Sequence, residues 1–432
     1  MDFYVEPSAL TGEIAIPPSK SHTMRALVFG MMGKGKTLID HYLPSPDTNS
    51  MIRAIQSFGA GVKVQDDTVI IEGNAGKLSP PDDVIHAGNS GIVLRFIGAL
   101  AGLCPTYTVI TGDHSIRHQR HVSPLLEGLN QLHAIAHSMR LDGKAPLIIK
   151  GMMKPGVAKI SGEDSQPISA LLIAASFLQG TTVLHVENSG EKPWIDMTMV
   201  WCERLGIKIE HEHYARYVIH GHAAYEGFHT SIPGDFSSAA FPLAAALITN
   251  SEVTLYNLDM TDCQGDKQLI ILLQNMGAFI ECDPHHRSLS VRRGSKLRGG
   301  IIDINDCIDI LAILAVIACF AEGQTQIINA TIARKKESDR IHAMCTELKK
   351  MGADIVEQED GLIINPSLLH GAELFSHRDQ RVAMALTVAA LGATSPSRIH
   401  DVEWIDKTYP HFLTDFQQLG AKITHESHLV RL

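Results

Sequence analysis

Charged residues gather in short motifs that stand directly before apolar, helix-forming stretches. The densest motif is Arg334–Arg340 (RKKESDR), in which Glu337 lies between Lys336 and Arg340 along the chain. A carboxylate held among cations stays ionised and can accept a proton, while a neighbouring lysine can deliver one. The segment also fits an ordinary capped helix, because Ser338 could serve as the N-cap. The motif therefore indicates acid–base chemistry without excluding a structural role.

A second motif, Pro17–Arg25 (PPSKSHTMR), combines helix-start signals with cations. The two prolines end a strand, and Ser19 or Ser21 can cap the helix that follows. Lys20 and Arg25 then lie near a helix N-terminus, where free N–H groups already favour an anion. An ordinary capped helix with solvated charges is the alternative explanation.

Other candidate positions share this place at the start of a helix. They are Asn89 and Gly91 in Ala87–Gly91 (AGNSG), Arg120 in Asp113–His121 (DHSIRHQRH), Ser165 and Gln166 after Asp164, Arg381 in the segment RDQR that begins at Arg378, and Lys407 in WIDKTYP. Asp309 lies in an otherwise apolar predicted helix, CIDILAILAVIACFA, where an unpaired buried carboxylate is costly. We therefore expect Asp309 to be a helix cap or a functional acid that faces a cleft.

The cationic motifs together predict a polyanionic ligand. If the helices run parallel within a domain, their N-termini converge and form a locally positive cleft in a chain of net charge −10. No spacing of His, Cys or acidic residues suggests a metal site, and no dinucleotide-binding glycine fingerprint is present. We therefore expect neither a metal nor an organic cofactor.

The segment Gly30–Thr37 (GMMGKGKT) matches the phosphate-binding P-loop pattern in full. That motif requires a strand before it and a helix after it. Here Met24–Met32 is predicted to be a helix and Thr37–Tyr42 a strand, so the order is inverted. We reject the P-loop interpretation.

Six copies of one unit position these motifs. In each copy an apolar residue and a glycine, or a substitute for it, precede two strand-like segments; the glycine positions are Gly59, His133, Gly206, Gly277, Gly352 and Gly420, 68 to 75 residues apart. Glycine is expected where a helix ends in a left-handed cap before a strand. Each unit of about seventy residues is predicted to contain a strand, a helix, a strand, a helix and a hairpin. Such a unit cannot bury its apolar faces alone, so the copies must pack together.

Composition restricts the classes of protein further. The 432 residues are 45% hydrophobic and 19% charged, which favours folded domains over disorder. The longest strictly apolar run, Ile310–Ala321, is too short to span a bilayer, and the N-terminus has no signal-peptide pattern. Seven scattered cysteines without a CxxC pair predict reduced thiols in the cytosol. The negative net charge argues against nucleic acid as the main partner.

In this order, the motifs resemble those of the 5-enolpyruvylshikimate-3-phosphate synthase family of enolpyruvyl transferases. PPSKSHTMRAL resembles PGSKSxSNRAL, GNSGIVLR resembles GNxGTxxR, KESDR resembles K-E-[ST]-D-R, DQRVAMAL resembles D-H-R-M-A-M, and KTYPHF resembles K-[ST]-[FY]-P. The resemblance covers essentially the whole chain. It implies a two-lobed, inside-out α/β barrel fold of six βαβαββ repeats, three per lobe. Lobe I would comprise residues 1–17 and 236–432 and lobe II residues 18–235, with the active site in the cleft between the lobes.

The resemblance also implies a reaction and the residues that perform it. The enolpyruvyl group of phosphoenolpyruvate would be transferred to the 5-hydroxyl of shikimate 3-phosphate through a tetrahedral intermediate, releasing phosphate. The implied catalytic residues are Asp309, as base at the hydroxyl, and Glu337 and Lys20, which handle protons at the methylene carbon. The residues implied to bind shikimate 3-phosphate are Lys20, Ser21, Arg25, Ser165, Gln166, Asp309 and Lys336. The residues implied to bind phosphoenolpyruvate are Lys20, Asn89, Gly91, Arg120, Gln166, Arg340, Arg381 and Lys407.

The same resemblance implies a cytoplasmic monomer in aromatic amino acid (chorismate) biosynthesis. Its partners would be the two small anionic substrates, with glyphosate as an inhibitor, and neither nucleic acid nor a membrane. Ile92 stands where the family usually has Thr, and His121 where Pro is usual. We expect this loop to alter discrimination between phosphoenolpyruvate and glyphosate.

Other departures from the family pattern affect the shikimate-phosphate region. Gln380 replaces the usual His, so proton handling by that residue is lost. Asp164 replaces a Ser, Trp194 replaces a Tyr, and Glu191 falls near a phosphate-binding Ser, for which Ser189 is the alternative if the alignment shifts by two. Added carboxylates would repel a phosphate, which affects this subsite and not the reaction.

Two other functions compete with this prediction. The transferase that acts on UDP-N-acetylglucosamine shares the fold and chemistry, but its loop usually carries a Cys or Asp as general acid. The segment Thr111–Pro124 contains no Cys, and Asp113 alone does not restore the match. A non-catalytic anion-binding repeat protein would need the cations but not Asp309 and Glu337. Both observations favour the shikimate enzyme.

Overall fold

The computed structural model describes residues 1–426, and the end of the predicted sixth hairpin, residues 427–432, lies outside them. The chain forms two compact units. Unit 1 comprises Met1–Pro17 and Pro233–Leu432, and unit 2 comprises Pro18–Ile232. Each unit contains three four-stranded sheets. Among the described residues, no helix combines the length and the apolar character needed to cross a membrane.

Unit 2 encloses three buried helices within its three sheets. The buried helices are α1 (Lys20–Met32), α3 (Gly91–Ala101) and α6 (Ser165–Ala175), and the others are α2 (Pro46–Ser57), α4 (His114–His118), α5 (Ser123–Gln131) and α7 (Lys192–Arg204). The strands are β3 (Lys34–Asp40), β4 (Gly61–Gln65), β5 (Thr68–Asn74), β6 (Ile85–His86), β7 (Tyr107–Thr111), β8 (Ile135–Ser138), β9 (Leu147–Lys150), β10 (Val157–Ser161), β11 (Thr182–Glu187), β12 (Ile209–Glu212), β13 (Arg216–Ile219) and β14 (His229–Ser231). The sheet orders are β14-β3-β5-β4, β6-β7-β9-β8 and β10-β11-β13-β12.

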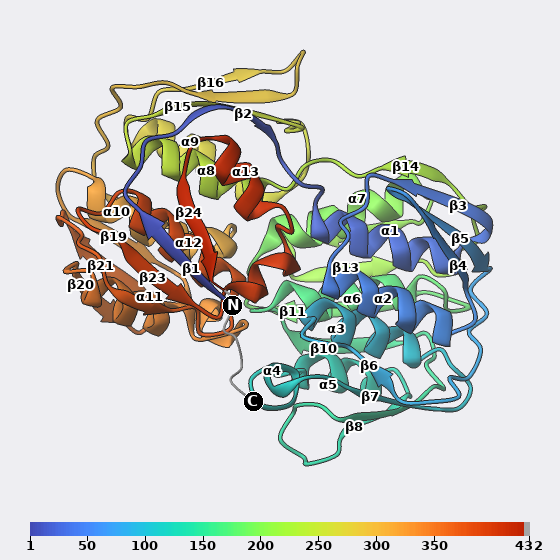
Figure 1. Ribbon diagram of the computed structural model, residues 1–432. Coiled ribbons are helices and arrows are strands. Elements are labelled where there is room, and N and C mark those ends of the chain that lie inside the picture. Colours follow the sequence, from blue (N-terminus) through green and yellow to red (C-terminus); the bar gives the residue numbers. More distant parts are fainter. Residues whose placement is uncertain (427–432) are drawn as a thin grey trace, which may run out of the picture. The chain divides into compact units, whose positions relative to one another are not determined.

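Unit 1 repeats this plan (Figure 1). Its buried helices are α8 (Phe236–Ile248), α10 (Leu311–Phe320) and α12 (Gln380–Leu391), and the others are α9 (Gln268–Asn275), α11 (Arg340–Lys350), α13 (Phe412–Gln418) and the 3-10 turns η1 (Gly265–Lys267), η2 (Ile308–Ile310), η3 (Thr331–Lys335) and η4 (Val402–Lys407). The strands are β1 (Asp2–Glu6), β2 (Thr11–Ala15), β15 (Glu252–Tyr256), β16 (Ile280–Asp283), β17 (Ser288–Val291), β18 (Ile301–Asp303), β19 (Thr325–Ile328), β20 (Asp354–Gln358), β21 (Gly361–Asn365), β22 (Glu373–Phe375), β23 (Ser397–His400) and β24 (Lys422–Glu426). The sheet orders are β16-β17-β15-β2, β18-β19-β21-β20 and β22-β23-β1-β24.

The predicted sixfold repeat is confirmed, with one refinement. In every sheet one pair of neighbouring strands is parallel, and the other two pairs are antiparallel. Three sheets, however, take one strand from a distant part of the chain. β14 pairs with β3, β2 pairs with β15, and β1 inserts between β23 and β24.

The six predicted helix ends all have the left-handed backbone. The five glycines have φ between 72° and 104°, and His133 has φ 69°. The rejection of the P-loop is also confirmed, because Gly30 lies inside α1 and the chain then enters β3. A Cβ on Gly30 would lie 2.8 Å from the side chain of Ile71 on β5, so glycine here permits close packing of helix against sheet.

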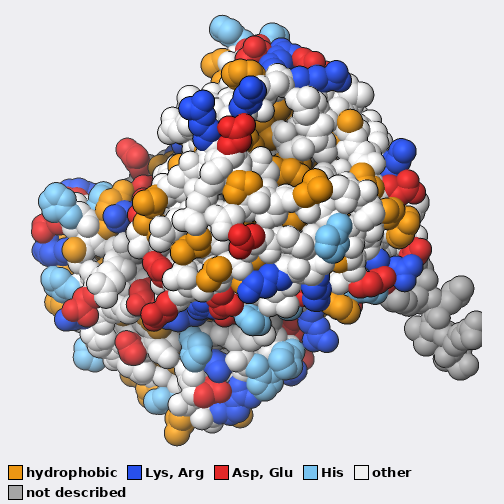
Figure 2. Space-filling view, turned by 90° about the vertical axis from the view of Figure 1, so that its left-hand side faces the viewer, with side chains coloured by type: hydrophobic (Ala, Val, Ile, Leu, Met, Phe, Trp, Pro, Cys, Tyr) orange, Lys and Arg blue, Asp and Glu red, His pale blue; other side chains and the backbone are white. Residues whose placement is uncertain are grey.

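Charged side chains of both signs are dispersed over one face of the molecule (Figure 2). On the face shown in Figure 2, acidic and basic side chains alternate and do not form a region of one sign. This arrangement suits a solvated exterior, and the described part of this face carries no cationic patch that would attract a polyanion (Figure 2).

Candidate active site

In unit 1 the starts of α10 and α12 meet, and the first turn of α12 also packs against α8. Arg381, in the first turn of α12, places its guanidinium 5.9 Å from the ring centre of Phe241 on α8. Its Nη2 lies 3.7 Å from Oδ2 of Asp309, which directly precedes α10. Because α10 and α12 start side by side, their unbonded N–H groups and partial positive charges are concentrated in one place.

Arg340 links three carboxylates at this point. Its side chain is only 1% exposed, and its Nη1, Nη2 and Nε lie 2.7, 2.8 and 2.8 Å from Asp309, Glu337 and Asp379. Burial alone would lower the pKa of Arg340, but the three carboxylates raise it well above its usual value. The guanidinium therefore stays charged and fixes the positions of all three acids.

Glu337 lies between two cations, of which Arg340 belongs to its own motif and Lys407 comes from another motif. Lys407 Nζ lies 2.6 Å from Glu337 Oε1, and Arg340 Nη2 lies 2.8 Å from Glu337 Oε2. The Glu337 side chain is 8% exposed. A carboxylate in this position is well oriented and adjacent to a lysine that can exchange protons with it.

The structure corrects the position of Asp309. The sequence placed this residue inside an apolar helix, but it lies in the turn η2, directly before α10. Burial would raise the pKa of Asp309, yet Arg340, Arg381 and Lys336 hold it below the usual range. With 27% of its side chain exposed, Asp309 is more accessible than Glu337 or Asp379. It is the acid of this group that a substrate hydroxyl can best reach.

Arg381 is the strongest candidate for direct contact with an anion in unit 1. Its Nε and Nη1 are buried and have no hydrogen-bond partner within residues 1–426. Asp379 caps α12 by accepting the backbone N–H of Arg381 at 2.9 Å, which orients the first turn. Gln380, where the family has His, is also buried, with an Oε1 that lacks a partner in the described part of the chain.

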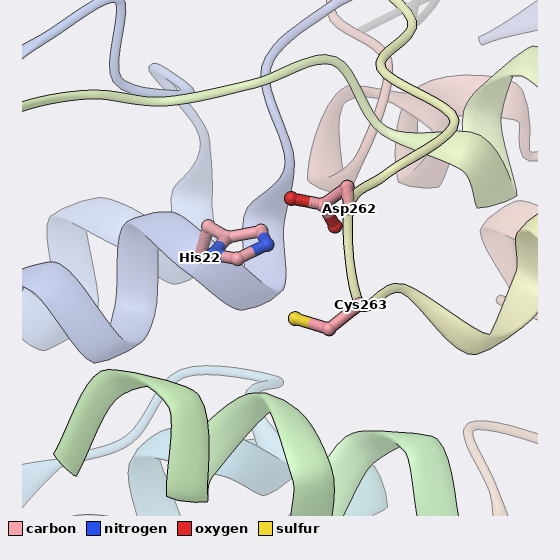
Figure 3. A group of neighbouring side chains, drawn as sticks. All are labelled: His22, Asp262 and Cys263. Carbon is pink, nitrogen blue, oxygen red and sulfur yellow. The ribbon is translucent and has the colours of Figure 1, made fainter. Parts of the chain in front are cut away.

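In unit 2, α1 carries most of the Pro17–Arg25 motif. Ser19 caps the helix, so Lys20 and Ser21 occupy its first turn, and Lys20 Nζ lies 3.5 Å from Asp47. The neighbouring His22 accepts a hydrogen bond from Trp201 Nε1 at 3.0 Å and is labelled in Figure 3. These contacts fix the start of α1.

Arg25 is already engaged within unit 2. It is buried, and it donates from Nε to Thr198 at 2.9 Å and from Nη2 to the carbonyl oxygen of Trp194 at 2.8 Å. Its guanidinium lies 5.4 Å from the ring centre of Phe96 on α3. The residue therefore joins α1 to α7 and α3, in addition to the ligand-binding role that the family pattern implies.

The starts of α3 and α6 also meet in unit 2. Arg95 donates to the carbonyl oxygen of Gly91 at 3.2 Å and to Gln166 Oε1 at 3.3 Å. A Cβ on Gly91 would lie 2.9 Å from Arg95 Nη1 and 3.4 Å from Arg120 Nη1. Glycine at position 91 therefore lets two buried guanidinium groups lie close to the backbone at the start of α3. Asn89 donates to Asp113 Oδ2 at 2.6 Å and anchors the loop before α3.

Glu191 and Asp164, the acidic residues predicted to disturb the phosphate region, each bind other residues of unit 2. Glu191 has a left-handed backbone at the start of α7 and is buried. Its carboxylate accepts the backbone N–H of Ser165 at 3.1 Å and the hydroxyl of Ser165 at 3.2 Å. Asp164 caps α6 and lies 2.8 Å from Arg95. The N–H and hydroxyl donors of Ser165 and the cation of Arg95 could each bind an anion. In this structure they are paired with the carboxylates of Glu191 and Asp164.

Two residues beside the candidate active site, Arg95 and Asp266, are not among the candidates that the sequence predicts. Arg95 connects Gly91, Gln166 and Asp164, but a single arginine one turn inside an apolar helix gave only a weak signal. Asp266, in η1, is buried beside the first turn of α8, where Ser237 donates a hydrogen bond to it. Its only sequence signal is a Gln-Gly-Asp step before an apolar stretch.

The fold itself belongs to the enolpyruvyl transferases. The structure of the enolpyruvyl transferase NikO from Streptomyces tendae superposes with a TM-score of 0.77 at 16% identity, covering 98% of each chain. The structure of EPSP synthase from Acinetobacter baumannii superposes with a TM-score of 0.84 at 26% identity, covering 99% of this chain and 100% of that one. The predicted fold class is confirmed.

Sequence comparisons specify the family. The model of the family described as EPSP synthase (3-phosphoshikimate 1-carboxyvinyltransferase) matches residues 5–416. Proteins named 3-phosphoshikimate 1-carboxyvinyltransferase from Acetivibrio thermocellus and Chlamydia muridarum are each 42% identical, over 97% and 98% of this chain and 98% and 96% of their own. The chain belongs to the EPSP synthase family. The predicted family, enzyme class and shikimate-pathway transferase activity are confirmed.

Proposed function

We propose that this protein transfers the enolpyruvyl group of phosphoenolpyruvate to the 5-hydroxyl of shikimate 3-phosphate by addition and elimination. The observation that carries the proposal is the buried Arg340, which holds Asp309 and Glu337 at 2.7 and 2.8 Å while Lys407 holds Glu337 at 2.6 Å. A protein that only bound anions would not need two fixed carboxylates among its cations, because they weaken anion binding.

In the addition step, the 5-hydroxyl oxygen bonds to C2 of phosphoenolpyruvate and its proton passes to Asp309. The C3 methylene takes a proton from the Glu337 and Lys20 set and becomes a methyl group. In the elimination step, the C2–O bond to phosphate breaks and the methyl group returns a proton, which leaves an enol ether and inorganic phosphate. Arg340, Arg381 and Lys407 would stabilise the charge on the phosphoenolpyruvate groups as it develops.

Residues of both units enter this proposal. The residues of unit 2 that would bind phosphoenolpyruvate are Lys20, Asn89, Gly91, Arg120 and Gln166. The residues that would bind shikimate 3-phosphate are Lys20, Ser21, Arg25, Ser165, Gln166, Asp309 and Lys336. The low proton affinity of Asp309 fits a base that acts only as the new C–O bond makes the hydroxyl acidic.

A comparison of acceptors tests the function. Purified protein is incubated with phosphoenolpyruvate and shikimate 3-phosphate, UDP-N-acetylglucosamine or unphosphorylated shikimate, and released phosphate is measured. We expect rapid release with shikimate 3-phosphate only. Rapid release with UDP-N-acetylglucosamine instead would support the sister transferase, and no release with any acceptor would support a binding protein.

We further propose a cytoplasmic monomer that glyphosate inhibits. All seven cysteines are free thiols, which fits a reducing compartment. Ile92 lies in the first turn of α3 beside Gly91, so the change from the usual Thr replaces a hydroxyl with an alkyl group there. We expect Ile92→Thr to change the inhibition constant of glyphosate, and an unchanged constant would contradict this role. Size-exclusion chromatography with light scattering tests the monomer.

A further inference from the structure

Asp266 is a buried acid that the proposed reaction steps leave without a role. The loop that contains Asp262 and Cys263, labelled in Figure 3, leads into η1, where Asp266 is 1% exposed. Its Oδ2 accepts a hydrogen bond from the hydroxyl of Ser237, in the first turn of α8. Its Oδ1 is buried and has no hydrogen-bond partner within residues 1–426. A buried carboxyl group with one unmatched oxygen is costly and calls for an explanation.

The charged neighbours of Asp266 belong to the candidate active site. Its pKa is raised to about 7, first by burial and then by the charge of Asp309, while Arg381 and the hydrogen bond from Ser237 oppose the rise and Asp235 adds to it. The pKa of the Cys307 thiol, beside η2, is raised first by burial and then by the charge of Asp266. The neighbouring helix α9 brings no charged side chain.

Arg381 is shared between the two acids. Its guanidinium lies 3.7 Å from Asp309, and its charge favours the ionised forms of both Asp309 and Asp266. We propose that Asp266, buried in η1 and bonded to the start of α8, is a positioning residue that sets how tightly Asp309 holds a proton through its own charge. This inference rests on the proposed function, in which Asp309 is the base.

The direction of the effect follows from the charges. When Asp266 is neutral, the cations around Asp309 dominate and keep its affinity for a proton low. When Asp266 ionises, a second negative charge enters the same buried region and opposes the effect of these cations on Asp309. Asp309 then binds a proton more readily, which favours removal of the proton from the 5-hydroxyl. Ionisation of Asp266 should therefore raise kcat as the pH increases through the titration range of Asp266.

The Asp266→Asn variant keeps the shape of the side chain and fixes it in the neutral form. We expect the rise of kcat between about pH 6 and pH 8 to be about threefold to tenfold smaller than in the unmodified protein, with KM for shikimate 3-phosphate unchanged. The matched control is Asp283→Asn, which removes a partly exposed carboxylate on β16 of the same unit. It should leave the profile as it was. An Asp266→Asn profile that superposes on that of the unmodified protein would overturn the inference.

A second variant keeps the carboxylate and changes only its hydrogen bond. Ser237→Ala removes the donor that stabilises ionised Asp266, so the rise of kcat should move to higher pH. A shift to lower pH, or none, would contradict the inference even if Asp266→Asn failed to fold. Asp309→Asn separates the two hypotheses. If Asp309→Asn turns over normally, the proposed function of Asp309 is wrong. If Asp309→Asn loses turnover but the pH profile of Asp266→Asn is unchanged, only the proposed role of Asp266 is refuted.

Discussion

Replacing Glu337 with Gln should remove most turnover while both substrates still bind. The carboxylate is 8% exposed and lies 2.6 Å from Lys407 and 2.8 Å from Arg340. The amide has nearly the same shape, but it cannot take up or release the proton that the methylene carbon requires. General acid–base catalysis contributes about 10²–10⁴-fold in rate, which corresponds to about 3–5 kcal/mol. We expect kcat to fall by this factor.

The same substitution also weakens a buried ionic network. Removing one partner of a buried ion pair costs about 3–5 kcal/mol. Arg340 still contacts Asp309 and Asp379, and the amide oxygen of Gln can still accept one hydrogen bond. We therefore expect a smaller loss in the free energy of unfolding, about 1–3 kcal/mol. Urea unfolding measures this loss separately from activity.

Glu347→Gln is the matched control for this experiment. Glu347 is 1% exposed and lies 2.7 Å from Lys350 and 2.8 Å from His377, away from the candidate active site. Its substitution removes the same charge from a similar environment. We expect a comparable loss of stability with normal kcat, measured by phosphate release, and normal affinity for shikimate 3-phosphate, measured by calorimetry. If Glu337→Gln turned over normally, or if both variants lost turnover equally, Glu337 would have no role in proton transfer.

The remaining predictions concern substrate affinity and pH-dependent stability. Glu191→Ser removes the carboxylate that occupies the donors of Ser165, so KM for shikimate 3-phosphate should fall about tenfold, and an unchanged or higher KM would argue against a phosphate at this position. Gly91→Ala places a methyl group 2.9 Å from Arg95 Nη1, so KM for phosphoenolpyruvate should rise several-fold while the melting temperature stays nearly constant; normal KM would show that the ligand does not approach Gly91. Burial would raise the pKa of Glu347, but His377 and Lys350 lower it, so its contribution to stability is complete above about pH 4.3 and is lost at lower pH. The stability difference between Glu347→Gln and the unmodified protein should thus be full at neutral pH and shrink in acid, and a difference that grew in acid would reverse the sign of this argument.

The repeat architecture could be predicted because each copy obeys the same backbone constraint. Gly59 and its counterparts end a helix with positive φ, and this requirement recurs along the sequence. His133 keeps the same conformation at φ 69°, so the geometry persists where the residue type has changed. The positions of helices and hairpins depend on such local signals, and they were therefore accessible from the sequence.

Pairing between strands that are far apart in the chain could not be predicted from the sequence in the same way. The pairing of β1 with β23 and β24, and of β14 with β3, joins segments whose local patterns resemble any other strand. Asp266 is a similar case. Its sequence neighbourhood resembles a loop, and only the fold brings it to Ser237 and into the field of Asp309. Charge motifs indicate candidate ligand-binding residues, whereas a residue without such a motif, such as Asp266, becomes a candidate only in three dimensions.

Solvent deuterium provides the most direct test of the central claim, that the cations and carboxylates of this chain carry out enolpyruvyl transfer by addition and elimination. The protein is incubated in D2O with phosphoenolpyruvate and shikimate 3-phosphate, and the product is examined by mass spectrometry and NMR. The account predicts release of phosphate together with an enolpyruvyl ether that carries deuterium in its methylene group, because C3 passes through a methyl group. A product without deuterium in the methylene group, or no transfer to shikimate 3-phosphate, would contradict it.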